Sequence, residues 1–258
     1  MAAGRAWVGT SGWSYRHWRG VFYPPGLPAN RWLDFYCRHF DTVEVNFSFY
    51  RLPTRQSFEG WRTRTPADFR FAIKANRTIT HLHRLKHAGP AWQRFWDNAQ
   101  GLAEKLAVVL VQLPPAQRAD VTRLADFTAL LPAGVRFAFE FRHQSWFVPE
   151  VYAVLEGRGY ALCQANAPGQ PGEHVPTGPY RYLRMHGGPS VEESDYSRPE
   201  LERWAASLRR STEQGRDVFV YFNNDPRGYA VANARFLSSL LPGSSGYSPP
   251  APSGEARG

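Results

Sequence analysis

A pair of opposite charges lies at the end of one stretch of sequence that is otherwise strongly apolar. In "RFAFEFR" (136–142) the phenylalanines hold one parity, and Ala138, Glu140 and Arg142 hold the other. Side chains of a strand alternate between its two faces, so one face is aromatic while the opposite face ends in a carboxylate and a guanidinium. Carboxylates suit general acid–base catalysis, and the planar fork of arginine suits capture of phosphate or carboxylate. This segment therefore carries candidate chemistry at its end.

The same order recurs in other stretches. "TVEVN" (42–46), "RFAIKA" (70–75) and "YRYLRMHG" (180–187) also alternate apolar residues with polar ones that end in charged or amide groups. Burying an unpaired charge costs several kcal/mol, so charges that recur at one end of such stretches indicate a shared polar site. We expect one cavity to contain Glu44, Asn46, Lys74, Gln112, Glu140, Arg142, His143, Arg184, His186 and Asn223.

Roles within this site follow from residue type. The candidate catalytic residues are Glu44, Lys74, Glu140 and His186. The candidate ligand-binding residues are Trp13, Trp18, Asn46, Gln112, Arg142, His143, Trp146, Arg184, Tyr221 and Asn223. The two arginines would hold an anion, and Trp18 or Trp146 would stack on a base or sugar, with Tyr15, Phe49 and Tyr50 as further aromatic candidates. The competing structural interpretation is that the carboxylates only neutralise the nearby cations and that the aromatics only seal the core.

No cofactor is expected. A divalent metal held by some of Glu44, Glu140, His143, His186 and Asp225 is the alternative, but no short ligand spacing such as His-Glu-x-x-His supports it. The two cysteines, Cys37 and Cys163, also lack a metal-like spacing, and we expect buried thiols rather than a disulfide.

The elements that must position these residues alternate along the chain. Short β-branched and aromatic runs cover 6–12, 42–46, 70–75, 107–113, 136–142, 161–165, 180–187 and 217–224. Helical patterns fall around 30–39, 54–64, 90–105, 120–131, 149–158, 198–214 and 229–241, whereas the connection 166–179 is too rich in Pro and Gly. Strands that alternate with helices predict βα units and a parallel sheet.

Eight such strands predict an α/β fold with a single (β/α)₈ barrel of the TIM type over residues 1–241, with the sixth helix short or missing. Residues 242–258, rich in Pro, Gly and Ser, are expected to be a disordered tail. In a barrel one strand face packs on the helices and the other points inward, with the active site at the carboxyl ends of the strands. That placement would bring the charges of separate strands together. No Gly-x-Gly-x-x-Gly or Walker-type loop follows any expected strand.

Net charge points to the class of partner. The formal charge of +9 favours an anionic small molecule or nucleic acid, although the arginines are dispersed and would also suit a solvated surface. The start of the sequence lacks a secretory apolar run, and no segment is long enough to span a membrane. We therefore expect a cytoplasmic protein without a membrane partner, and no feature indicates an oligomeric state.

Several segments carry a resemblance to a known family. "GTSGWSYRHWRGVFYP", "TVEVNFSFYRLP", "FAIKANRTITH", "VQLPP", "FEFRHQSW", "YLRMHG" and "VYFNND" occur in the same order as in the YecE-like family, a domain of unknown function (DUF72). The resemblance implies a TIM barrel. The similarity of that barrel to apurinic-site endonucleases suggests nucleic acid as a ligand, but this chain has no evident His, Asp and Glu set for a three-metal site.

The leading hypothesis is an enzyme, a hydrolase or lyase, acting on a phosphate-bearing substrate such as nucleic acid or a nucleotide derivative by general acid–base chemistry. A first alternative is glycoside hydrolysis by Glu44 and Glu140. A second is a non-catalytic protein that binds nucleic acid through its positive charge.

Overall fold

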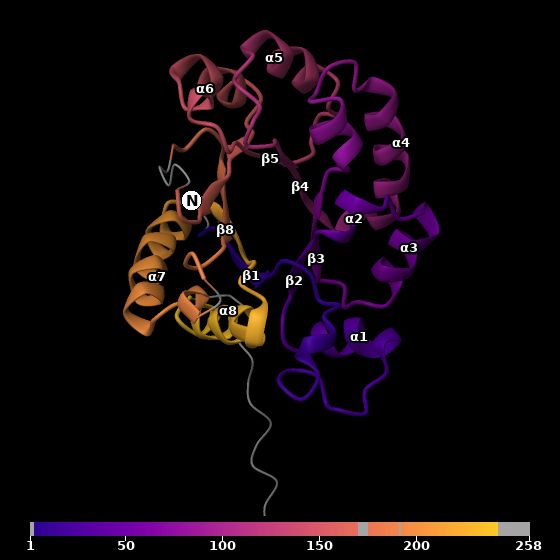
Figure 1. Ribbon diagram of the computed structural model, residues 1–258, viewed down its shortest axis with the longest axis vertical. Coiled ribbons are helices and arrows are strands. Elements are labelled where there is room, and N and C mark those ends of the chain that lie inside the picture. The colour runs from indigo at the N-terminus through magenta and orange to yellow at the C-terminus, as the bar shows by residue number, and fades with distance from the viewer. Residues whose placement is uncertain (1–2, 170–174, 191, 242–258) are drawn as a thin grey trace, which may run out of the picture.

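Parallel strands form the centre of the computed structural model, which describes residues 3–169, 175–190 and 192–241 (Figure 1). The strands are β1 (Ala6–Thr10), β2 (Thr42–Val45), β3 (Arg70–Lys74), β4 (Leu106–Gln112), β5 (Phe137–Glu140), β6 (Ala161–Leu162), β7 (Gln164–Asn166), β8 (Tyr180–Met185) and β9 (Asp217–Phe222). They pair as two parallel sheets, ordered β1-β9-β8-β7 and β2-β3-β4-β5-β6. All strand positions lie within two residues of the expected runs, so the parallel α/β class is confirmed.

The expectation of one closed barrel is not confirmed. The strands surround a common interior (Figure 1), but no sheet among the described residues closes on itself. The sixth expected strand is divided at Cys163, so its first part pairs with β5 and its second part with β8. Between β1 and β2, the Tyr36 hydroxyl accepts from Thr10 N at 3.0 Å and donates to the Thr42 carbonyl at 3.1 Å. A side chain therefore links β1 and β2 where a ladder bond would lie, and the two strands share only the bridge between Ser11 and Glu44.

Helices lie outside the ring of strands (Figure 1). They are α1 (Trp32–Tyr36), α2 (Phe47–Tyr50), α3 (Arg55–Thr63), α4 (Gly89–Ala99), α5 (Val121–Ala129), α6 (Pro149–Glu156), α7 (Arg198–Glu213) and α8 (Tyr229–Ser239). All the expected helices are confirmed, and the short α2 is additional. The connection from β7 to β8 holds no helix in its described residues, and the expected tail 242–258 lies outside the described residues.

Local sequence explains where several helices begin. The side chains of Thr54 and Asp120 accept the backbone N–H of the residue three positions later, at the starts of α3 and α5. Ser197 and Glu200 form a capping box at the start of α7. These bonds satisfy N–H groups that have no partner within the helix. No helix of the described residues is long and apolar enough to cross a membrane.

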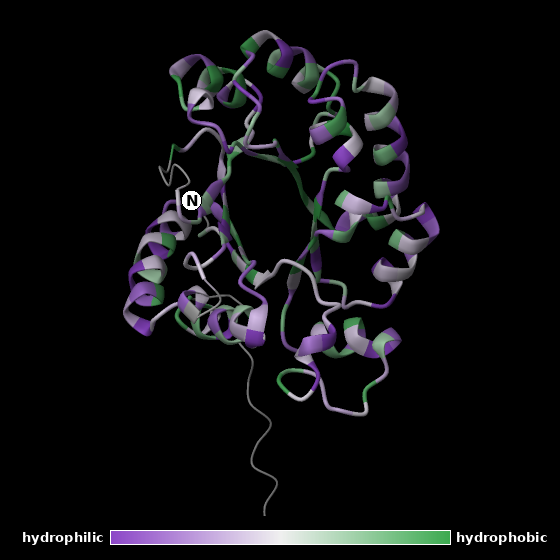
Figure 2. Cartoon of the chain, in the orientation of Figure 1, coloured by the Kyte–Doolittle hydropathy of each residue, from purple (hydrophilic) through white to green (hydrophobic). Residues whose placement is uncertain are grey.

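The alternation in β5 sorts its side chains as the sequence predicts. Phe137, Phe139 and Phe141 are buried between the strands and the helices. Ala138 instead belongs to a second apolar cluster, inside the ring of strands, with residues such as Leu110. The strand β4 is correspondingly green along its length in Figure 2. The interior is thus packed with apolar side chains below the carboxyl ends of the strands, a region that we call the mouth.

Candidate functional site

The Arg184 guanidinium is the centre of the mouth. From β8 it donates to both oxygens of Glu44 at 2.9–3.1 Å and to Glu140 Oε2 at 2.7 Å. Gln112 Oε1 and Asn46 Oδ1 each lie 3.5 Å from its terminal nitrogens. Residues from strands far apart in the sequence therefore meet at one fully buried cation, as the shared parity predicts.

Both carboxylates are enclosed and fully bonded. Glu44 also accepts the hydroxyls of Ser11 and Tyr182, each at 2.6 Å. Glu140 accepts Arg142 Nε at 2.8 Å on its other oxygen. Burial alone would raise the pKa of Glu140, but the guanidinium groups of Arg184 and Arg142 outweigh burial and hold that pKa well below its usual range. Glu140 is thus a permanent counter-ion at neutral pH.

This arrangement decides against glycoside hydrolysis by the Glu44–Glu140 pair. One guanidinium binds both carboxylates, and neither side chain has exposed surface. A glycosidase needs its two carboxylates on either side of a sugar, with one of them able to hold a proton. The same geometry corrects the role expected of Arg184, because a cation with its nitrogens already bound to carboxylates is not free to hold a substrate anion.

Lys74 is a cation without a carboxylate partner. It ends β3 with 9% of its surface exposed, and its Nζ lies 4.1 Å from the centre of the Phe49 ring. Nζ makes no hydrogen bond or ion pair within the described part of the chain. Burial, followed by the charge of Arg184, lowers the pKa of Lys74 to about 8, although Glu140 and Glu44 oppose this shift.

Arg142 is the second cation with free capacity. Its Nε is bound to Glu140, while its side chain is 28% exposed. Its two terminal nitrogens make no hydrogen bond with any residue that the structure describes. A guanidinium fork fixed at one nitrogen and open at two others is suited to bidentate binding of an oxyanion.

Burial and the neighbouring cations lower the pKa of two histidines of the mouth. Burial, and then Arg184, lowers the pKa of His186 to about 4; its Nδ1 accepts from Asn223 Nδ2 at 2.9 Å. Burial, and then Lys74 and Arg142, lowers the pKa of His81 to about 4. Both rings are therefore neutral at pH 7, and His186 can accept a proton without first losing one.

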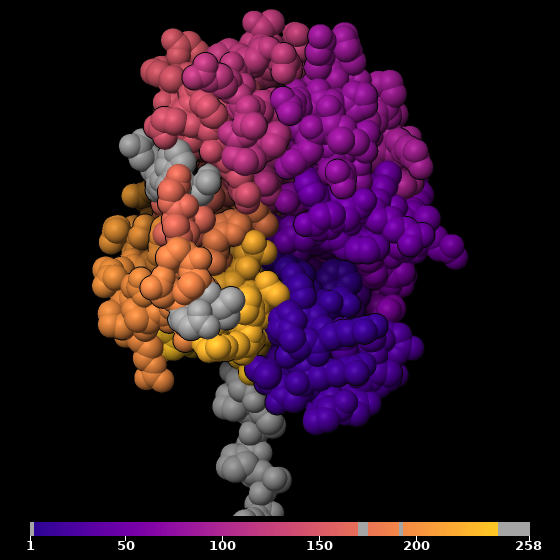
Figure 3. Space-filling view, in the orientation of Figure 1, coloured from indigo at the N-terminus to yellow at the C-terminus, as the bar shows by residue number. Residues whose placement is uncertain are grey.

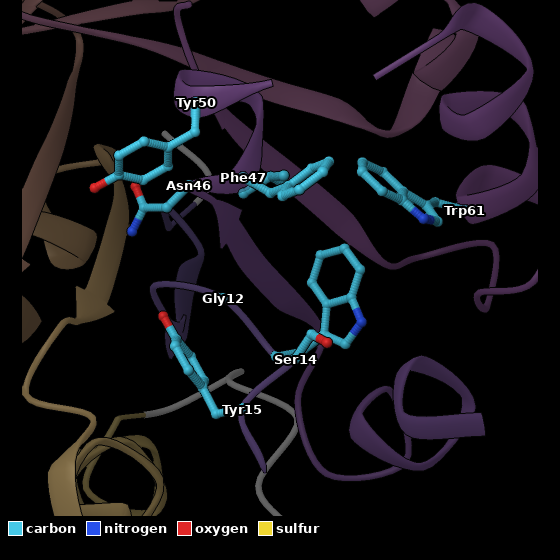
Figure 4. Close-up of a pocket in the computed structure, with 9 residues that line it drawn as sticks. Gly12, Ser14, Tyr15, Asn46, Phe47, Tyr50 and Trp61 are labelled. Carbon is cyan, nitrogen blue, oxygen red and sulfur yellow. The ribbon is translucent and has the colours of Figure 1, made fainter. Parts of the chain in front are cut away.

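An aromatic cavity of about 450 Å³ adjoins the charged residues. It is lined by Gly12, Trp13, Ser14, Tyr15, Val45, Asn46, Phe47, Tyr50 and Trp61. Figure 4 shows Tyr50, Phe47 and Trp61 along one side of it and Tyr15 and Ser14 along the other. Asn46, which follows β2, belongs both to this cavity and to the surroundings of Arg184.

The short helix α2 joins the cavity to Lys74. Ser48 Oγ donates to the Lys74 carbonyl at 2.7 Å and so fixes α2 on the end of β3. Phe49 then lies under the Lys74 ammonium, with its ring 5.0 Å from the ring of Tyr50. Phe47 and Tyr50 are 54% and 72% exposed, which leaves ring surface for a ligand.

Three of the expected ligand-binding residues are fully buried, and a fourth has a structural partner. Trp18 and Trp146 are fully buried, with their indole N–H groups bonded to the carbonyls of Asp225 and Gln117. Trp18 belongs to the segment after β1, which packs against the segment after β9 where the indigo and yellow regions meet in Figure 3. A ring without exposed surface has no face on which a ligand can stack, so the stacking role of both tryptophans is corrected.

The other two are Tyr221 and His143. Tyr221 is fully buried in the strand interior, where its hydroxyl is bonded to Thr42 Oγ1 at 2.7 Å. His143 Nδ1 accepts the backbone N–H of Ser145 at 3.1 Å, and so caps the turn Gln144–Trp146. The first is a core residue, and the second has a structural partner.

Sequence reasoning missed Ser11, Phe47, Trp61 and Tyr182 as residues of the mouth and its cavity. Tyr182 shares the parity of Arg184, so its inward direction was a usable signal. Ser11 follows β1 directly, at the expected end of a strand. Trp61 lies on the distant helix α3, and no spacing in the sequence relates it to Trp13, whose ring it meets edge-on at 5.1 Å.

The five residues of the metal alternative do not converge. Among the described residues no group of three or more His, Cys, Asp or Glu is placed to hold a metal ion. Asp225 pairs with His17 at 3.2 Å, while Glu44 and Glu140 are bonded to Arg184. The donor set therefore does not fit a metal site built from Glu44, Glu140, His143, His186 and Asp225.

These features define an α/β protein of parallel strands with a polar site at their carboxyl ends. The chain belongs to the DUF72 family, because the family described as "Protein of unknown function DUF72" matches its residues 7–255. This match confirms the resemblance. The UPF0759 protein YunF of Bacillus subtilis (strain 168) is 28% identical over 270 aligned positions, covering 91% of this chain and 94% of YunF. The UPF0759 protein YecE of Escherichia coli (strain K12) is 30% identical over 142 positions, covering 55% of this chain and 50% of YecE.

Solved structures agree with the fold. A DUF72 family protein from Thermotoga maritima has a TM-score of 0.81 at 30% identity, covering 92% of this chain and 99% of that one. A DUF72 family protein from Enterococcus faecalis V583 has a TM-score of 0.78 at 20% identity, covering 92% and 95%, and shows likeness of fold alone.

Proposed function

We propose that this chain is an enzyme that binds an anionic, phosphate-bearing ligand with a flat ring, a nucleotide or nucleic acid, at the mouth. The observation that carries the proposal is a surplus of positive charge beside the aromatic cavity. Lys74 has no carboxylate partner, and Arg142, paired with Glu140 through Nε, keeps two terminal nitrogens without a bond to any described residue. The phosphate would accept hydrogen bonds from the terminal nitrogens of Arg142, and the ring would enter the cavity.

Charge balance supports the anion. Glu44 and Glu140 contribute two negative charges, whereas Arg184, Arg142 and protonated Lys74 contribute three positive ones. The two neutral histidines add nothing to this balance at pH 7. The surplus cation lies in a partly enclosed region, where its attraction for an anion is less screened by salt than on an open surface.

The aromatic cavity supports the ring. Its aromatic lining offers faces and edges for stacking, and each stacked base contributes about 1–3 kcal/mol. Asn46 supplies amide hydrogen-bonding groups to the same cavity. An inorganic anion would use the cations alone, so the cavity favours a ligand larger than phosphate.

Proton transfer would then fall to His186 and Lys74 rather than to the two glutamates. His186 is neutral at pH 7, and Lys74 has a pKa close to neutrality. A pKa close to the working pH suits Lys74 to general acid–base catalysis, as in a hydrolase or a lyase, whereas the low pKa of His186 makes it the weaker base of the two. The two glutamates would act as positioning residues, because they hold Arg142 and Arg184 in place.

Calorimetric titration of the purified chain with adenosine monophosphate, adenosine and inorganic phosphate tests this function. We expect the monophosphate to bind at least about ten-fold more tightly than adenosine or phosphate, because only it uses both the cations and the cavity. Arg142→Gln should lower the affinity for the monophosphate by about ten-fold or more and leave the affinity for adenosine unchanged. The matched control Arg123→Gln removes a partly exposed arginine of α5 that pairs with Asp120, and it should change the affinity for neither ligand.

A non-catalytic surface that adheres to nucleic acid gives a different result. Binding of an oligonucleotide would fall steeply with salt and would be unaffected by Arg142→Gln. That result, combined with no binding of the monophosphate, would contradict a ligand site in the mouth.

A further inference from the structure

The Lys74 amine has an unusual environment for an enclosed cation. Polar groups in protein interiors are normally hydrogen-bonded, and enclosed charges normally have a partner of opposite charge. Among the described residues, Lys74 Nζ contacts the face of the Phe49 ring but has no hydrogen-bond partner. It is not fully buried, because it retains contact with solvent. It is therefore both unpaired and reachable.

Another lysine of the same chain shows what structural use of a buried amine looks like. Lys105 Nζ donates to the carbonyls of Arg62 and Thr65, each at 2.6 Å, and to Thr65 Oγ1 at 3.1 Å. All three of its donor positions are used, so its lone pair is unavailable. Lys74 has no such partners, although it is also buried and ends a central strand.

We propose that Lys74 Nζ is a nucleophile that forms an imine with an aldehyde or ketone carried by the phosphate-bearing ligand. The inference rests on the proposed function in one respect, because Arg142 would hold the phosphate while Lys74 meets the carbonyl carbon. The nitrogen lone pair forms a bond to that carbon, and the carbon–oxygen π pair moves to oxygen, which takes a proton. The nitrogen releases both of its protons over the two stages, and the carbinolamine loses this oxygen with two protons as water. Amine and carbonyl thus give imine and water, without an oxidant or reductant.

The surroundings of Lys74 favour this reaction. Nucleophilic amines need an unprotonated fraction at neutral pH, and burial beside another cation supplies it. Burial and the Arg184 guanidinium lower the pKa of Lys74 to about 8. The Lys74 ammonium packs on the Phe49 ring, and the bond from Ser48 to the Lys74 backbone carbonyl fixes α2, which carries Phe49, on the end of β3.

Borohydride trapping provides a direct test, because the sequence contains only three lysines, Lys74, Lys86 and Lys105. The intact chain is incubated with pyridoxal phosphate, an aldehyde with a ring and a phosphate, used here only as a probe. Sodium cyanoborohydride then reduces any imine to a stable secondary amine, and mass spectrometry of peptides measures the adduct on each lysine. We expect Lys74 to be labelled at least about ten-fold faster than the exposed Lys86, with negligible labelling of Lys105.

Two further measurements separate reactivity from simple exposure. The rate of labelling at Lys74 should rise with pH around a midpoint of about 8. Lys74→Arg keeps the positive charge but removes the nucleophile, so it should abolish the main adduct and leave Lys86 labelled as before. Equal labelling of Lys74 and Lys86 in the unmodified chain would overturn the proposal, whether or not the variant folds.

Pyridoxal, which lacks the phosphate, distinguishes this proposal from the proposed function. If pyridoxal phosphate labels Lys74 and pyridoxal does so at least about ten-fold more slowly, both the imine and the anion site are supported. If the two aldehydes label Lys74 equally, the imine is supported and the anion site fails. If adenosine monophosphate binds and is weakened by Arg142→Gln while no adduct forms at Lys74, the anion site is supported and the imine is overturned.

Discussion

Arg184 and Glu140 form an enclosed ion pair, with Nη1 of the guanidinium 2.7 Å from Oε2 of the carboxylate. The pair joins the carboxyl ends of β5 and β8, which belong to different sheets. Glu44 and Glu140 together balance two of the three cations of the mouth, so one positive charge remains. Lys74 has no carboxylate partner, and Arg142 keeps two open terminal nitrogens. This division of roles among like-charged residues leads to the following predictions.

Glu140→Gln should lower the stability of the fold. Removing one partner of an enclosed ion pair leaves a buried charge uncompensated, which typically costs about 3–5 kcal/mol. Urea denaturation should show a loss of that order in the free energy of unfolding. Glu59→Gln, which breaks the exposed pair of Arg55 and Glu59 on α3, should cost less than about 1 kcal/mol. A Glu140→Gln protein as stable as the unchanged chain would show that Glu140 is not a structural counter-ion.

The stability of the chain should fall with pH between about 6.5 and 4 because of His186. Its pKa is about 4 in the fold, against about 6.5 for an unperturbed histidine, so the unfolded chain binds the proton first. The stabilisation is complete above pH 6.5 and is lost as the pH falls to about 4, with a contribution of at most about 3 kcal/mol. Titration of the His186 ring by NMR should give the low value, and His186→Gln should flatten this part of the stability profile. A measured pKa above 6 would contradict both the burial of the His186 ring and the effect of Arg184 on it.

Tyr36→Phe should loosen the junction of β1 and β2. The Tyr36 hydroxyl bonds to Thr10 N, Thr10 Oγ1 and the Thr42 carbonyl, and phenylalanine would leave these buried groups without their partner. We expect a loss of about 1–3 kcal/mol in the free energy of unfolding and faster amide exchange at Thr10. Tyr50→Phe removes a hydroxyl from an exposed ring and serves as the control. Equal stability of the two variants would mean that the hydroxyl does not hold the strands together.

Phe47→Ala should lower the affinity for ligands that carry a ring without lowering the affinity for inorganic phosphate. Phe47 lines the aromatic cavity and is more than half exposed, so its removal costs little packing but takes away stacking surface. Affinity for adenosine monophosphate should fall by about 1–3 kcal/mol in a calorimetric titration. Leu130→Ala, at another exposed apolar position, is the matched control. An unchanged affinity would place the ring outside the cavity.

Much of the fold followed from periodicity. Alternation with a period of two fixed which side chains of β2, β3, β5 and β8 point inward, and hence that Glu44, Lys74, Glu140 and Arg184 gather at one end. Periodicity did not predict the break at Cys163, because that break depends on which neighbouring strand each half of the run pairs with. It did not predict the Tyr36 link between β1 and β2 either, because that link is made by a side chain from a helix. Neither leaves a local pattern in the sequence.

The roles within the mouth were less predictable than its membership. Arg142 and Arg184 have the same residue type, parity and strand-end position, yet one is enclosed by two carboxylates and the other retains two open nitrogens. The roles of aromatic residues were equally hard to predict. Trp18 is buried whereas Trp61 lines the cavity, and segments far away in the sequence decide this difference. Distances between elements, rather than residue types, assign these roles.

A crystal structure of the chain with adenosine monophosphate tests the central claim most directly. The phosphate should lie within hydrogen-bonding distance of the terminal nitrogens of Arg142, with the base in the cavity lined by Trp13, Phe47 and Trp61. A nucleotide bound instead in the cavity of about 770 Å³ that is lined by Trp7 and Arg136 at the other end of the strands would contradict a ligand site at the mouth.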